Sequence, residues 1–96
     1  MSVGVVARLK IKEGTNEDFE KVFSDLAQAV RENETGNNFY ALHRSRDDNT
    51  TYIVLEQYAD QAALEAHGQS DHFKTIGAKM GPYLAGRPEV EYMDAV

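Results

Sequence analysis

Phenol, carboxyl and imidazole side chains are concentrated in one stretch of the sequence, from Thr51 to His72. The groups in it that could hold or transfer a proton are Tyr52, Glu56, Tyr58, His67 and His72. A neutral imidazole can remove a proton near neutral pH, and hydrogen-bond donors in a dry pocket stabilise the anion left behind. We therefore take His72, His67 and Glu56 as candidate catalytic residues.

A strand predicted from Thr51 to Tyr58 positions the carboxyl group. Side chains alternate along a strand, so Glu56 shares one face with Tyr52 and Tyr58. Ile53 to Leu55 is an unbroken apolar run, from which we expect both faces of this strand to be covered. A buried carboxylate needs a partner, so Glu56 could serve the structure as readily as catalysis.

The first of two short helices predicted after this strand carries His67 in its last turn. Asp60 caps this helix, Gln61 to Ala66 form it, and Gly68 ends it. The negative end of a helix dipole favours a charged imidazole, so we assign His67 to stabilising the substrate anion. The same helix end would also stabilise a histidine that has no catalytic role.

The second helix carries His72 in its first turn, after Ser70 and Asp71. The positive end of the dipole favours a neutral imidazole, which makes His72 the candidate base; a surface histidine is the alternative. Glu56 would orient one of the two histidines. Because His67 and His72 are five residues apart across a glycine, they fit one helix face poorly, and we expect no metal site.

Composition excludes several classes of function. The chain has 96 residues, no cysteine, 10 basic and 16 acidic side chains, and a net charge of −6. We expect a single domain over residues 1–96, no thiolate chemistry, and no nucleic-acid partner for so acidic a protein. No apolar run approaches the ~20 residues of a membrane span, and no secretory signal is visible, so we expect a cytoplasmic protein.

The remaining elements follow from hydrophobic periodicity. A helix is expected from a capping box at Thr15 and Asp18 to about Asn33, with Phe19 and Phe23 on its apolar stripe. The last helix should run from about Asp71 to Met80. The predicted strands are Val3–Lys12, Asn38–Arg46, Thr51–Tyr58 and Glu89–Asp94.

This order predicts an α+β fold of the ferredoxin-like βαββαβ type. Its four-stranded antiparallel sheet carries both helices on one face. The other face would expose apolar side chains in a single chain, and an exposed apolar patch usually marks an interface. We therefore expect a homodimer that packs sheet against sheet.

Four segments carry a resemblance to a known family: Lys12-Glu13-Gly14, Leu55-Glu56-Gln57-Tyr58, Leu64-Glu65-Ala66-His67 and Ser70-Asp71-His72-Phe73. Over nearly its whole length the chain resembles the antibiotic biosynthesis monooxygenase domain of the dimeric α/β barrel superfamily. The bacterial quinol monooxygenases and the autoinducer-processing isomerases are especially similar. The resemblance implies a ferredoxin-like protomer that dimerises through its sheet, with a pocket between sheet and helices.

Many members of that family oxidise phenols, quinols or anthrones with molecular oxygen and no cofactor. We therefore expect a cofactor-independent monooxygenase acting on a small aromatic molecule, with no metal and no membrane partner. The expected substrate-binding residues are Tyr52, Tyr58, Tyr40 and Phe23. The alternatives are an isomerase or degradation enzyme for a small carbonyl metabolite, and a non-catalytic dimeric binding domain.

Two segments depart from the family pattern. Tyr58 stands where tryptophan is frequent, and Glu34 to Asn38 replaces a Glu-Gly-Cys-like start of the second strand. The haem-degrading relatives use an asparagine, a tryptophan and a haem-ligating histidine. Ala7, His67 and Gly77 stand at those positions, so the resemblance does not extend to haem breakdown.

Overall fold

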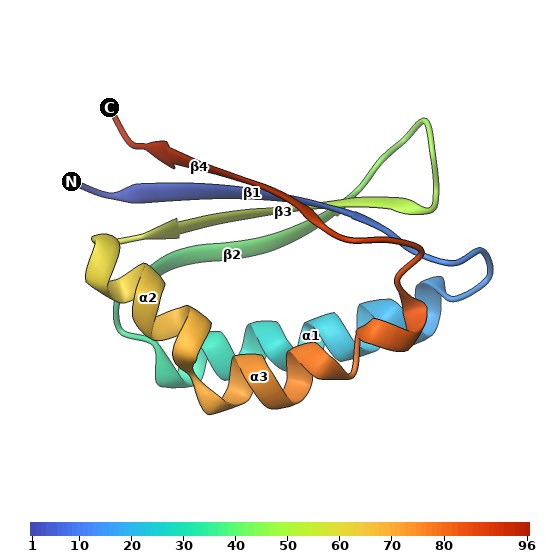
Figure 1. The fold of residues 1–96 in the computed structure, drawn as a ribbon, viewed down its shortest axis with the longest axis horizontal. Helices are drawn as coiled ribbons and strands as arrows, with labels where there is room; N and C mark the ends of the chain where they lie inside the picture. Colours follow the sequence, from blue (N-terminus) through green and yellow to red (C-terminus); the bar gives the residue numbers. More distant parts are fainter.

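The computed structural model describes all residues, 1–96, as one four-stranded antiparallel sheet with the helices packed on one face (Figure 1). The strands lie in the order β2-β3-β1-β4, so the two central strands are the first and the third along the chain. This is the predicted ferredoxin-like βαββαβ topology. The elements are β1 (Val3–Lys10), α1 (Asn16–Asn33), β2 (Asn37–Arg44), β3 (Thr51–Tyr58), α2 (Gln61–Gln69), α3 (Asp71–Ala78), a 3₁₀ turn η1 (Gly81–Tyr83) and β4 (Glu89–Asp94).

The central strands bury one face and expose the other. Along β3 the buried positions are Tyr52, Val54, Glu56 and Tyr58, in strict alternation with more exposed ones. Leu55, on the outer face, is 38% exposed. The expectation that both faces of this strand are covered therefore fails within one chain, because all helices pack on the same side of the sheet (Figure 1).

Helix α1 supplies most of the core opposite the sheet. Its apolar stripe is buried as predicted, with Phe19 at 0% and Phe23 at 3% exposure. The predicted capping box does not form. The Thr15 side chain makes no cap hydrogen bond and instead donates to the carbonyl oxygen of Lys12 at 2.6 Å. Its backbone (φ −104°, ψ 11°) is not in the extended conformation from which an N-cap side chain reaches the helix amides.

Ser70 sets the bend between α2 and α3. The predicted stop at Gly68 is wrong: α2 continues to Gln69, and Ser70 is the first residue with an extended backbone (φ −69°, ψ 149°). The Ser70 hydroxyl donates to the carbonyl oxygen of His67 at 2.7 Å and accepts from the amide of Phe73 at 3.2 Å. One side chain thus joins the end of one helix to the start of the next.

The C-terminal segment returns along the sheet to place β4 beside β1. Helix α3 ends at Ala78, two residues before the predicted Met80. Strand β1 also ends two residues early, at Lys10, because Ile11 forms only an isolated bridge with Leu84. Strand β4 has its predicted bounds. No helix in the fold has the length and apolar character needed to span a bilayer.

Candidate functional site

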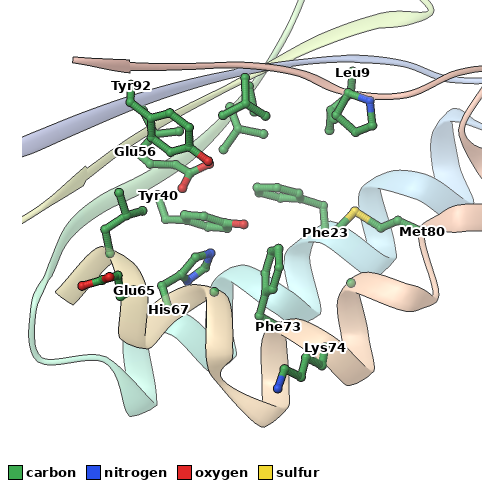
Figure 2. Close-up of a pocket in the computed structure, with 18 of the residues that line it drawn as sticks. Leu9, Phe23, Tyr40, Glu56, Glu65, His67, Phe73, Lys74, Met80 and Tyr92 are labelled. Atoms are coloured by element: carbon green, nitrogen blue, oxygen red, sulfur yellow. The ribbon is translucent and has the colours of Figure 1, made fainter. Parts of the chain in front are cut away.

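A cavity of about 850 Å³ lies between the inner face of the sheet and helices α1, α2 and α3 (Figure 2). This volume is within the range of small-molecule sites. The lining is mainly apolar, with a few polar groups contributed by β2, β3, β4, α2 and α3. Among the lining residues are Val5, Leu9, Phe23, Tyr40, Val54, Glu56, Leu64, His67, Phe73 and Tyr92.

Four of the seven predicted site residues line this cavity, and three do not. Those that do are His67, Glu56, Tyr40 and Phe23. Their rings and carboxyl group lie together in Figure 2, between the sheet and the helices. Those that do not are His72, Tyr52 and Tyr58.

His67 is held in an aromatic surround and is only 4% exposed. Its ring centroid lies 5.3 Å from that of Tyr40, 5.2 Å from that of Tyr58 and 4.7 Å from that of Phe73. Tyr40 in turn stacks on Phe23, with centroids 5.3 Å apart and ring planes 4° apart. The imidazole therefore has little freedom to rotate, and its edge facing the cavity is fixed by packing.

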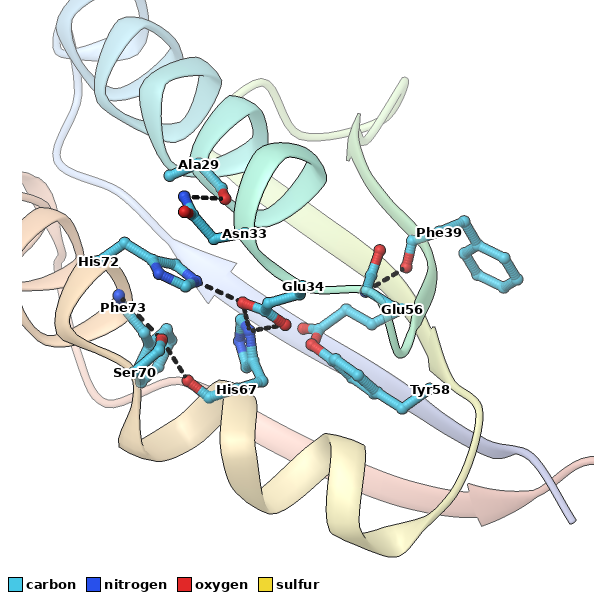
Figure 3. A network of polar contacts seen from close by, with 11 residues as sticks. Ala29, Asn33, Glu34, Phe39, Glu56, Tyr58, His67, Ser70, His72 and Phe73 are labelled. Atoms are coloured by element: carbon cyan, nitrogen blue, oxygen red, sulfur yellow. Dashed lines mark hydrogen bonds and ion pairs between the residues drawn. The ribbon is translucent and has the colours of Figure 1, made fainter.

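Glu34 joins the two histidines (Figure 3). Its carboxylate oxygens lie 2.9 and 3.0 Å from Nδ1 of His67, and Oε2 also lies 2.5 Å from Nε2 of His72. The side chains of Glu34, His67 and His72 are 10%, 6% and 16% exposed. The sequence analysis did not select Glu34. The signal it carried was its position, because a lone carboxyl group in the short link from α1 to β2 must lie near the end of the sheet where α2 begins.

The bend at Ser70 explains why two histidines that fit one helix face poorly still meet. His67 is in the last turn of α2 and His72 in the first turn of α3, so the change of direction turns both rings toward Glu34. The three ligand atoms lie within 4.8 Å of one another, and two imidazoles with a carboxylate form a donor set that Zn²⁺ or Fe²⁺ can use. The hydrogen bonds among the three also satisfy them without an ion.

Glu56 forms a second polar group in the same region. It is 8% exposed and accepts a hydrogen bond of 2.7 Å from the hydroxyl of Tyr58. Burial, with a smaller contribution from the charge of Glu34, raises the pKa of Glu56 from 4.5 to about 7, although the Tyr58 hydrogen bond opposes this. Glu56 can therefore exchange a proton close to neutral pH.

The two phenols near Glu56 remain protonated. Burial raises the pKa of Tyr40, and the charges of Glu56 and Glu34 raise it further. Burial also raises the pKa of Tyr58, followed by the charge and hydrogen bond of Glu56. Both hydroxyls are therefore hydrogen-bond donors throughout the physiological range. Tyr58 uses its proton on Glu56, whereas the Tyr40 hydroxyl makes no hydrogen bond within the protein and lines the cavity.

Tyr52 lies at the opposite end of β3, away from this group. Its hydroxyl donates to Glu20 at 2.5 Å and accepts from Nδ2 of Asn16 at 2.8 Å. Glu20 also lies 3.5 Å from Nη1 of Arg44. These partners tie the start of α1 to the sheet, and they do not line the cavity.

Comparison with known proteins identifies the family. The model of the antibiotic biosynthesis monooxygenase family matches residues 2–79, most of the chain. The chain belongs to this family. The match includes Glu34, Glu56, His67 and His72, and it ends directly after α3. Members of the family are monooxygenases that act on small molecules with oxygen.

Relatives with sequence and structural similarity support the assignment. A Bacillus subtilis (strain 168) protein named "Putative monooxygenase YcnE" is 33% identical over 82 residues, which are 85% of this chain and 84% of that protein. The solved structure of a "putative antibiotic biosynthesis monooxygenase" from Caulobacter crescentus CB15 is 50% identical, with a TM-score of 0.96 over 99% of this chain and 90% of the other.

The fold is shared with a more distant enzyme as well. A mutant of SnoaB from Streptomyces nogalater, described as a cofactor-independent oxygenase, has a TM-score of 0.85 over 98% of this chain and 92% of its own. Its sequence is 22% identical, so this likeness concerns the fold alone.

Proposed function

We propose that this family member is a cofactor-independent monooxygenase that oxidises a small aromatic phenol, quinol or anthrone with molecular oxygen. The observation that carries the proposal is the place of His67: its ring lines an apolar cavity, and its Nδ1 is held by Glu34. A base in a dry pocket is what an electron-rich aromatic substrate requires before it can react with oxygen. The cofactor-independent chemistry of SnoaB, which has the same fold, is consistent with it.

The reaction balances without a separate reductant. In an anthrone, the reacting CH₂ group would become a carbonyl group. One atom of O₂ enters the product, and the other leaves as water with the two hydrogens. All four electrons gained by O₂ come from the substrate. The protein therefore has two tasks, which are to remove the first proton and to hold the resulting anion.

Each task has a candidate group on the cavity wall. His67 takes the proton, and the Tyr40 hydroxyl, a protonated donor without a partner in the protein, hydrogen-bonds the substrate oxygen on which charge develops. This assignment reverses the one drawn from the helix ends, where His72 was the base. The reversal follows from access, because His67 lines the cavity and His72 does not. Phe23 and Phe73 would flank the aromatic rings.

The cavity lining favours this reading over the two alternatives. A phosphorylated carbonyl metabolite would call for several cationic side chains, and the lining contains one, Lys74, alongside Glu56 and Glu65. A binding domain without catalysis would be favoured by a filled or shallow pocket, and the cavity has about 850 Å³.

Oxygen uptake with a panel of naphthoquinols and anthrones tests the proposal. We expect the parent protein to accelerate uptake for at least one compound, and His67→Gln to reduce turnover by about 10²–10⁴-fold, the usual contribution of a general base. Raising the pH should partly restore His67→Gln, because more of the substrate is then already ionised. His72→Gln is the matched variant, and it should reduce turnover less because His72 does not line the cavity.

Two outcomes would contradict it. If no compound reacts faster with the protein than without it, the monooxygenase proposal fails. If His72→Gln shows the larger loss and the rescue at high pH, the base is His72 and the cavity argument is wrong.

We also propose that the protein works as a homodimer formed through the outer face of the sheet. That face exposes Phe39 (46%), Leu55 (38%) and Met93 (39%) in the single chain. Removing such an apolar patch from water is favourable, and two sheets can pack face to face. Leu55→Glu should give a monomer in sedimentation, with Gln28→Glu on the outside of α1 as control. A monomeric parent at micromolar concentration would contradict this.

A further inference from the structure

His67 and His72 both contact the single carboxylate of Glu34. We propose that Glu34 is the positioning residue of His67, and that it fixes the tautomer whose Nε2 lone pair faces the cavity. His72 holds Glu34 in place from the other side. The inference rests on the proposed function for its catalytic consequence, whereas the tautomer itself can be measured without a substrate.

The tautomer follows from the hydrogen bonds. A carboxylate accepts and cannot donate, so the hydrogen in the contact of 2.9 Å belongs to Nδ1 of His67. A neutral imidazole carries one N–H, which leaves the lone pair on Nε2. Nε2 of His67 makes no hydrogen bond within the protein. Every fully buried side-chain nitrogen and oxygen atom does have a hydrogen-bond partner, so Nε2 is not fully buried. The lone pair of His67 is therefore accessible, and the cavity is the space that His67 lines.

The same argument separates His72 from His67. Nε2 of His72 points at Oε2 of Glu34 and so carries the hydrogen in that contact. His72 does not line the cavity, and its donor is already used. His72 therefore helps to hold the Glu34 carboxylate in the position in which it bonds to His67.

The backbone around Gly36 sets the distance between Glu34 and His67. Glu34 directly follows α1, and its amide donates to the carbonyl oxygen of Val30 at 2.9 Å. Two residues later, Gly36 lies so close to α2 that a Cβ added there would be 2.5 Å from Cβ of Ala63. Ala63 is one helical turn before His67. The link that carries the carboxylate is therefore seated directly on the helix that carries the imidazole, and only glycine permits the approach.

Glu34 also provides charge where the reaction needs it. When Nε2 of His67 takes a proton, the ring becomes an imidazolium whose Nδ1–H already points at a carboxylate that is 10% exposed. The other ionisable groups facing this region are Glu56, Tyr40 and Tyr58, all of which respond to the charge of Glu34. At the cavity wall α2 and α3 add Glu65 and Lys74.

A purely structural role for the cluster predicts different results, so the test measures the tautomer directly. Side-chain ¹H–¹⁵N correlation spectra of protein treated with EDTA should show His67 with hydrogen on Nδ1 in the parent. Glu34→Gln, whose amide can either donate or accept, should lose this preference while remaining folded. Gly36→Ala should lose it as well, although Glu34, His67 and His72 are all intact. Glu32→Gln, on the exposed side of α1, is the control and should leave it unchanged.

The kinetic measurement uses the same variants and the oxygen-uptake assay. Glu34→Gln should lower kcat by at least about 10²-fold with little change in KM, because neutralising the carboxylate behind a catalytic histidine produces the wrong tautomer. Glu34→Asp keeps the charge and should recover part of the loss. His72→Gln should give a smaller loss of kcat, because the bond between Glu34 and His67 remains.

The outcomes distinguish this inference from the proposed function. An unchanged His67 tautomer in Glu34→Gln overturns the positioning role, and so does a lost tautomer with an unchanged kcat. If the tautomer changes as expected but the parent consumes no oxygen with any compound, then the monooxygenase proposal fails while Glu34 still positions His67. If Glu34→Gln raises KM and leaves kcat unchanged, Glu34 contributes to binding and the inference is wrong.

Discussion

The two ends of β3 carry the same pair of groups in different surroundings. At each end a buried tyrosine, Tyr52 (1% exposed) or Tyr58 (0%), donates its hydroxyl proton to a glutamate. Glu20, the partner of Tyr52, has a side chain 45% exposed and lies beside Arg44. Glu56, the partner of Tyr58, is 8% exposed and has no cationic side chain of Lys or Arg bonded to it.

The difference teaches that burial, and not the hydrogen bond from tyrosine, raises the pKa of the carboxyl group. Water and Arg44 stabilise the charge on Glu20, so that end of the strand is a structural tie between α1 and the sheet. At the other end burial raises the pKa of Glu56 to about 7, and the Glu34 carboxylate nearby adds to the effect. One strand thus carries a solvated glutamate at one end and a buried carboxyl group with a raised pKa at the other, and four predictions can break or sharpen the comparison.

The largest effect is expected for Glu56→Gln, measured as the free energy of unfolding against pH. The unfolded chain loses this proton near pH 4.5, while the folded chain keeps it until about pH 7. The contribution of Glu56 is thus fully present below pH 4.5 and is lost as the pH rises through 7. Relative to the parent, Glu56→Gln should gain about 3 kcal/mol between these limits.

Glu20→Gln is the matched control for that experiment. Its stability relative to the parent should change by less than about 1 kcal/mol over the same pH range, because the group is solvated and paired at the surface. Equal pH dependence for the two variants would show that burial does not distinguish the two ends.

A second, smaller effect is expected when the hydroxyl groups are removed. Tyr58→Phe leaves a buried carboxyl without its donor and should cost about 1–3 kcal/mol at pH 8. Tyr52→Phe should cost less, since Glu20 keeps water and Arg44 as partners. Urea unfolding of both variants at pH 8 checks the order, and a larger loss for Tyr52→Phe would reverse the comparison.

A third effect concerns the state of Glu56 itself in the Tyr58→Phe variant. The hydrogen bond from Tyr58 lowers the pKa of Glu56, in opposition to burial. Its removal should therefore raise this pKa above 7, which carboxyl ¹³C shifts can follow across pH. A lower pKa in Tyr58→Phe would mean that the hydroxyl does not donate to the carboxylate.

The smallest effect is expected from salt. The pair between Arg44 and Glu20 is half exposed, so Arg44→Gln should cost less than about 1 kcal/mol, and that loss should fall further at ~1 M salt. The titration of Glu56 should respond little to the same salt, since burial is its main cause. Strong salt dependence of the Glu56 titration would indicate that water reaches this carboxyl group.

Sequence periodicity was sufficient for the order of the helices and strands, and four of the seven residues selected from the sequence line the cavity. The alternation along Tyr52, Glu56 and Tyr58 correctly put a carboxyl group between two phenols on the inner face. It could not tell that neither of these phenols would line the cavity while Tyr40 would, because that depends on where α2 and α3 cross the sheet. The position of Glu34 in the link from α1 to β2 indicated only that it lies near the start of α2. Its contacts with both histidines could not be predicted, since they join residues 33 and 38 positions apart through a bend at Ser70.

The placement of the two histidines depends on tertiary geometry that local rules do not describe. Helix dipoles favoured a neutral His72 and a charged His67, and each argument was sound for an isolated helix. In the folded chain one carboxylate bonds to both rings, and exposure to the cavity belongs to His67 alone. Access to the cavity is decided by how α2 and α3 cross the sheet, and the helix dipoles carry no information about it.

Because the cavity lies between the sheet and the helices, a ligand bound in it should raise the melting temperature of the protein. A molecule that binds in the cavity of about 850 Å³ needs the folded form, and at 100 times its Kd it adds about 2.7 kcal/mol of stability. In a domain of this size each 1 kcal/mol raises Tm by roughly 4–8 °C. Compounds can therefore be ranked by melting temperature before any reaction is known, including those that bind and do not react.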